Sequence, residues 1–148
     1  MTICTPNDIF NSGLPISTDI REEEVSLAIK TVSQFYLKNA IGAELYAAIM
    51  QDTTHQYDDI VLGTDTLAGL RLALEHGVFA YLLYDTIRAT RYGGVAKRSD
   101  ESENPKREDI LALSKHHWEI CEVFVREVAE SLQIEMPKGT NNFIFNEL

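Results

Sequence analysis

The chain has 148 residues, of which 45% are hydrophobic and 24% charged, the balance of one globular domain with a sizeable core. Its formal net charge of −10 argues against a surface that binds nucleic acid as a whole, because phosphate backbones are repelled at long range. No apolar run approaches the roughly 20 residues that span a bilayer, the first residues lack the features of a secretory signal, and two cysteines are too few for a disulfide framework.

The N-terminal segment, residues 1–16, is predicted to be irregular. Several of its residues favour turns: Pro6, Asn7, Asp8, Asn11, Ser12 and Gly13. A first helix is expected to begin near residues 17–19, where Thr18 is the cap candidate and the acidic residues 22–24 suit the positive end of a helix dipole. Apolar residues then recur at spacings of three and four and predict one buried face: Val25, Ala28, Ile29, Val32 and Phe35/Tyr36.

Gly42 breaks this pattern, and a short second helix is predicted over residues 43–51. Residues 52–63 are predicted to form a polar loop. The longest helix is expected over residues 66–91, with one apolar stripe made of Leu67, Leu70, Leu74, Val78 and Tyr81. Gly69 and Gly77 lie eight residues apart on one side of it, so they are expected to let a neighbouring helix approach closely.

A long polar connection follows and ends near residue 107, where a fourth helix is predicted to run to residue 133. One broad face of that helix is apolar: Ile110, Leu113, His117, Ile120, Cys121, Phe124, Val128 and Leu132. No segment alternates convincingly in the manner of a strand. The fold class is therefore all-α, a compact bundle of four to five helices in one domain over residues 1–148, with a helical core at 17–133 and an irregular C-terminal arm at 134–148.

The connection between the two long helices carries its basic residues first and its acidic residues after them. A basic block contains Arg88, Arg91, Lys97 and Arg98, and an acidic block follows with Asp100, Glu101 and Glu103. A segment that is basic on one limb and acidic on the other can pair head-to-tail with copies of itself. A solvated loop is the alternative interpretation, and the sequence favours neither.

The C-terminal arm ends with four large apolar residues, Phe143, Ile144, Phe145 and Leu148. Burying these side chains against a monomer stabilises by less than the conformational entropy of ordering the arm costs. The arm is therefore expected either to fray or to dock on a partner that also supplies backbone hydrogen bonds.

Candidate chemistry is sparse in the sequence. His117 and Cys121, four apart on a helix, could share a zinc ion, but the other histidines, His55 and His76, lie far away in sequence. His117 is instead expected to be a core histidine with one hydrogen-bond partner, and His116 to face water. No nucleophile motif is present, so the expectation is a protein that is not an enzyme, with no catalytic residue, metal or cofactor. A metal-dependent bundle enzyme is the less favoured alternative.

Residues 35–46, with the sequence FYLKNAIGAELY, resemble the "helix, Leu/Ile-Gly, Glu-Leu-Tyr" signature of the head–tail connector (head-completion adaptor) proteins of tailed bacteriophages. The order of predicted elements is similar over about residues 19–132. The resemblance implies a non-enzymatic virion assembly protein of a phage or prophage, which forms a homo-oligomeric ring under the portal. It implies contacts with copies of itself, with the portal protein and with tail-side connector proteins, while DNA only passes through and no membrane is involved. The protein would lie in the bacterial host cytoplasm before assembly and in the virion afterwards.

The family supplies no strict functional residues that can be carried over. The protein-interaction residues are therefore hypotheses drawn from charge and apolar character, namely the two charged blocks between Arg88 and Glu103 and the four apolar residues of the arm. The alternative function is a nucleic-acid-binding helical module that uses the basic block between Arg88 and Arg98.

Overall fold

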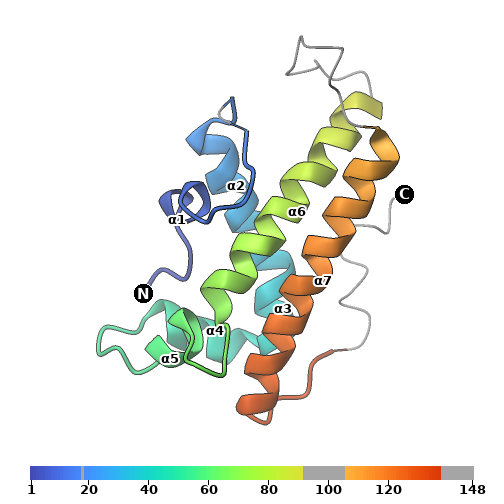
Figure 1. Ribbon diagram of the computed structural model, residues 1–148. Coiled ribbons are helices and arrows are strands. Elements are labelled where there is room, and N and C mark those ends of the chain that lie inside the picture. The colour runs from blue at the N-terminus through green and yellow to red at the C-terminus, as the bar shows by residue number, and fades with distance from the viewer. Residues whose placement is uncertain (18, 92–105, 138–148) are drawn as a thin grey trace.

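Two long helices, α6 (Leu70–Arg91) and α7 (Arg107–Ser131), lie side by side, run in opposite directions and share the most extensive contact between any two elements (Figure 1). The computed structural model describes residues 1–17, 19–91 and 106–137. The shorter elements are α1 (Pro6–Phe10), α2 (Glu22–Val32), the π-helix η1 (Ser33–Leu37), α3 (Lys38–Ile41), α4 (Ala43–Met50) and α5 (Asp58–Leu62). No strand occurs in these ranges, so the prediction of an all-α fold is confirmed.

The end of α7 lies close to its predicted position, and its local hydrogen bonds explain why. Gln133 adopts a left-handed backbone with φ of +58°, and the amide of Ile134 donates to the carbonyl of Ala129 at 2.8 Å. The amide of Gln133 donates to the carbonyl of Glu130 at 3.1 Å. These two bonds form a Schellman motif, which satisfies carbonyls that the last helical turn leaves open.

The prediction that residues 1–16 are irregular is wrong for residues 6–10, which form α1. Thr5 accepts a hydrogen bond from the Asp8 amide, the Asp8 carboxylate accepts one from the Thr5 amide, and Pro6 occupies the first turn. This is a capping box, and its residue types are the same ones that favour turns. Ile9 and Cys4 are buried, so the N-terminal segment contributes to the core.

The first predicted helix is broken into three elements in the structure. It begins at Glu22 after Arg21, later than predicted, and Thr18 lies outside the described residues. A π-helix over Ser33–Leu37 widens the turn, so Tyr36 and Leu37 are both buried while Phe35 points outward. Of the Phe35/Tyr36 position predicted on the buried face, Tyr36 is the residue that lies inside. Gly42, with φ of +94°, ends α3 as predicted.

Two predicted boundaries around α6 are also corrected. The region 52–63 contains the short helix α5, whose Val61 is buried, and α6 begins at Leu70 instead of residue 66. Gly69 stands before the helix with φ of +93° and packs against Gly63, so its predicted role as a small residue within a helix face is wrong. Gly77 does lie inside α6 and faces α7.

The core lies between the α6–α7 pair and the segment from α2 to α3. From α6 it takes Leu70, Ala73, Leu74, Val78, Phe79, Ala80 and Tyr84, so the apolar stretch at 78–84 is central as expected. From α7 it takes Ser114, Trp118, Cys121, Val125 and Val128. The buried face of α7 is thus rotated from the predicted one, because Trp118 turns inward and Leu113, expected inside, is exposed.

The seam between α6 and α7 is tightest at Gly77. A Cβ atom there would lie 2.8 Å from Cys121 Sγ and 3.5 Å from the Trp118 ring. Alanine gains about 1 kcal/mol in helix propensity, but overpacking a buried seam costs more, so we expect Gly77→Ala to lower the free energy of unfolding by about 1 to 2 kcal/mol. Urea denaturation followed by circular dichroism measures the loss.

A Cys121→Ala background tests the cause of that loss. With the sulfur removed, the nearest atoms to the new methyl group are at an ordinary 3.5 Å. Gly77→Ala should then be neutral or slightly stabilising. An equal loss in both backgrounds would mean that the Cys121 sulfur does not set the helix separation.

Candidate interaction surfaces

Most of the interaction residues predicted from sequence lie outside the described residues: Lys97, Arg98, Asp100, Glu101, Glu103, Phe143, Ile144, Phe145 and Leu148. Arg88 and Arg91 belong to the last turns of α6, but their side chains are also outside the description. The ends of α6 and α7 that flank the charged connection lie at the end of the molecule opposite α4 and α5 (Figure 1). These predicted sites therefore stay predictions.

The described surface has one strongly exposed apolar face, on α2 and η1. Leu27 is 65% exposed and Phe35 is 64% exposed, the highest values among the large hydrophobic side chains that the structure describes. Leu27 lies in a shallow depression with Glu22, Glu23, Ser26 and Lys30. We call Leu27 and Phe35, with the depression, the α2 face.

Two polar side chains next to Leu27 and Phe35 form hydrogen bonds with the backbone of the same helical segment. The Thr31 hydroxyl donates to the Leu27 carbonyl at 2.8 Å, and the Asn39 amide donates to the Phe35 carbonyl at 2.9 Å. These side chains thus turn their polar atoms onto the helix backbone. Large exposed apolar side chains are candidates for a protein–protein contact site.

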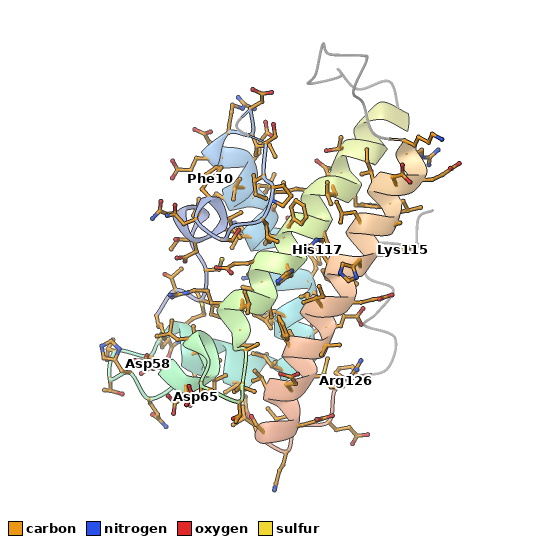
Figure 2. The ribbon with its side chains drawn as sticks, in the orientation of Figure 1. Phe10, Asp58, Asp65, Lys115, His117 and Arg126 are labelled. Carbon is orange, nitrogen blue, oxygen red and sulfur yellow. The ribbon has the colours of Figure 1, made fainter. Side chains whose placement is uncertain are left out.

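A second surface feature is a groove between α6 and α7. It is lined by His76, His116, Glu119, Ile120, Val123 and Phe124. His117 lies beside it, and the Nδ1 atoms of His76 and His117 are 2.9 Å apart, with their ring planes within 16° of each other. Figure 2 shows His117 on α7 at the boundary with α6. The prediction that His117 has a single hydrogen-bond partner therefore identifies a real contact, and the partner is His76.

Aromatic rings hold this histidine pair in place. The Phe79 ring meets His117 edge-on with centroids 4.7 Å apart, and the Phe124 ring meets His76 in the same manner at 5.9 Å. Burial, followed by the charge of neighbouring histidines, lowers the pKa of His76 and of His117. Both rings are therefore favoured in the neutral form, in which one Nδ1 donates and the other accepts. His116 is exposed, as predicted.

The thiols of the chain are poor nucleophiles in this fold. Burial raises the pKa of the Cys4 thiol to about 12, and burial also raises the pKa of the Cys121 thiol. Cys121 points into the α6–α7 seam at Gly77, whereas His117 bonds to His76, so the two do not form a shared metal site. Within residues 1–17, 19–91 and 106–137, no three metal-binding side chains gather in one place.

Burial also raises the pKa of two carboxyl groups, Glu75 and Glu122. For Glu75 the nearby Asp8 adds to the shift and Arg71 opposes it, and Arg71 also donates to the Ile3 carbonyl at 2.8 Å. This cluster ties α1 and the N-terminal residues to α6. It serves as packing of the N-terminal segment, and Glu122 lies apart from it on α7.

Comparison with protein-family models, with curated proteins and with solved structures finds no match to this chain. None of the helices in the described ranges combines the length and the apolar character required to cross a membrane. What the structure defines is an all-α protein built on an antiparallel helix pair, with an exposed apolar face on α2 and a histidine-lined groove between α6 and α7.

Proposed function

We propose that this chain is a non-enzymatic assembly protein of a tailed bacteriophage or prophage, a head–tail connector subunit that packs against copies of itself in a ring under the portal. The observation that carries the proposal is the α2 face, with Leu27 and Phe35 each about two-thirds exposed. Burying the exposed two-thirds of both side chains at an interface stabilises it by roughly 2 to 4 kcal/mol. That is a sizeable share of the free energy that a specific contact needs.

The position of the α2 face supports the same proposal. Phe35 begins the segment whose sequence resembles the connector family, and this segment folds as η1, α3, the Gly42 turn and the first half of α4. A ring needs two different contact patches on each subunit. The α2 face is proposed as one of them, and the charged blocks between Arg88 and Glu103 or the C-terminal arm as the other.

The proposed partners are the chain itself, the portal protein and tail-side connector proteins, with DNA only in passage. A net charge of −10 opposes association between free copies, so the ring is expected to close on the portal. An acidic lumen also suits a channel through which DNA slides without binding. The protein is proposed to lie in the host cytoplasm before assembly and in the virion afterwards.

Co-migration on a sizing column with the portal protein of the same phage or prophage tests the proposal. We expect the wild-type chain to co-migrate and Leu27→Asp to bind at least about tenfold more weakly, since about 1.4 kcal/mol of lost apolar contact suffices for that factor. Leu62→Asp is the matched control, because Leu62 is 52% exposed on α5, away from the α2 face. Failure of the wild-type chain to co-migrate at low and physiological salt would reject the connector function.

The alternative is a nucleic-acid-binding helical module that uses the basic block between Arg88 and Arg98. No acidic residue interrupts the chain from Thr86 to Ser99, which is the observation in its favour. DNA affinity that falls steeply with added salt would support it, and the absence of filter binding at low salt would remove it.

A further inference from the structure

We propose that His76 and His117 form a pH-sensitive latch between α6 and α7, closed while at most one of the two rings is cationic and opened when both are. The inference does not depend on the connector function. It starts from the 2.9 Å separation between the two Nδ1 atoms, which is short enough only if one nitrogen carries a proton and the other accepts it.

Proton counting defines the states of the latch. In the neutral pair, one ring carries its proton on Nδ1 and donates it to the bare Nδ1 of the other, which carries its own proton on Nε2. A first added proton can bind the free Nε2 of the donor ring, and the bridging hydrogen bond survives. A second added proton must bind the accepting Nδ1, so two N–H groups then face each other and the bond becomes a repulsion between cations.

The surroundings offer little relief to that repulsion. His116, one residue along α7, can add a third positive charge, and Glu119 is the one carboxylate among the residues that line the groove. The residues one turn away on α6 and α7 are uncharged: Leu72, Ala73, Phe79, Ala80, Leu113, Ser114, Ile120 and Cys121. In the described part of the chain, neither ring has a carboxylate hydrogen-bond partner.

The direction of the pH effect follows from the environment of the rings. Burial and the neighbouring histidines lower the pKa of both His76 and His117 from the ordinary 6.5. The closed latch therefore contributes its full stability above pH 6.5 and loses it as the pH falls through 6.5 and then through the lowered values. In the open state the two histidines regain their ordinary pKa. For each unit by which the pKa in the closed state lies below that value, the ratio of open to closed molecules in acid is about tenfold higher.

Opening has a built-in reporter, the thiol of Cys121. It is fully buried in the α6–α7 seam, one turn after His117 and against Gly77, which follows His76. Separation of the helices at the latch therefore exposes this sulfur. The other thiol, Cys4, lies in a different part of the core and can be removed by Cys4→Ala.

The experiment measures the rate at which 4,4′-dithiodipyridine modifies Cys121 in Cys4→Ala protein, divided by the rate for the urea-unfolded chain at the same pH. Between about pH 7.5 and pH 5 we expect this ratio to rise on the order of tenfold or more. His76→Gln keeps a hydrogen-bonding side chain that does not titrate, so its ratio should stay nearly constant. His55→Gln removes an exposed histidine beside Asp58 and should behave as the parent protein does.

Imidazole nitrogen NMR of the wild-type chain gives a second test that requires no variant. We expect one of the two histidines as the Nδ1–H tautomer, the other as the Nε2–H tautomer, and both titrating below 6.5. Two Nε2–H rings that titrate at or above 6.5 would overturn the latch. So would an equal rise in Cys121 reactivity in the parent protein and in His76→Gln.

Discussion

Replacing Gly69 with alanine is expected to lower the free energy of unfolding by about 3 to 5 kcal/mol, through backbone strain and overpacking together. Gly69 has φ of +93°, a backbone conformation that side chains with a Cβ rarely adopt. A Cβ there would lie 2.6 Å from the backbone nitrogen of Gly63 and 2.8 Å from the carbonyl oxygen of Val61. Since these are backbone atoms, no side-chain rotation relieves the contact. Urea denaturation measures the loss.

Gly13→Ala is the matched control for that prediction. Gly13 also has positive φ, at +83°, but a Cβ there meets nothing within 4 Å. Its substitution should cost only the strain, about 1 kcal/mol. If Gly69→Ala and Gly13→Ala lower the free energy of unfolding by the same amount, the close backbone contact between Gly63 and Gly69 contributes nothing to stability.

Gly69 also shows where sequence reasoning on this fold stops. The apolar stripe through Leu67, Leu70 and Leu74 continues across it at helical spacing, so periodicity places it inside the helix. In the structure the helix begins only at Leu70. The chain at Gly69 packs closely against the backbone at Gly63, and the carbonyl of Leu67 accepts from the Thr64 amide at 2.8 Å. Such close packing is a tertiary contact, which no local pattern contains.

Where local chemistry decides, the sequence is a better guide. The existence of both long helices, the break at Gly42 and the close approach at Gly77 follow from periodicity and glycine, and the structure confirms them. Helix α1 could also have been predicted, because Thr5-Pro6-Asn7-Asp8 matches a capping box with proline at the first helical position. The same residues also favour turns, and that property alone predicts an irregular segment.

The surface features were harder to predict. The periodicity assigns the Phe35/Tyr36 position to the buried face without choosing between the two, and in the structure Tyr36 is buried while Phe35 is exposed. His76 and His117 are 41 residues apart, so their pairing depends on the register between α6 and α7. The interaction residues that the sequence did nominate, from Arg88 to Glu103 and in the C-terminal arm, remain untested predictions.

The observed orientation of α7 buries Trp118, so a substitution of this residue is expected to lower stability strongly. Trp118 is 1% exposed, and its ring meets Tyr36 of η1 at 4.7 Å, so it joins the antiparallel pair to the first helical segment. Trp118→Ala removes the largest buried side chain and leaves a cavity that close-packed neighbours fill only in part. We expect a loss of about 3 to 5 kcal/mol in the free energy of unfolding. Trp118 is the chain's single tryptophan, so unfolding must be followed by circular dichroism.

Leu113→Ala distinguishes the observed face of α7 from the one that periodicity predicts. In the predicted orientation Leu113 is buried and its truncation would cost about 2 to 5 kcal/mol. In the structure it is 40% exposed, so the loss should stay below about 1 kcal/mol. In the observed orientation of α7, Trp118→Ala loses more stability than Leu113→Ala. In the orientation that periodicity predicts, Leu113→Ala would lose more. A Leu113 variant that loses more stability than the Trp118 variant would require α7 to be turned back by about one residue.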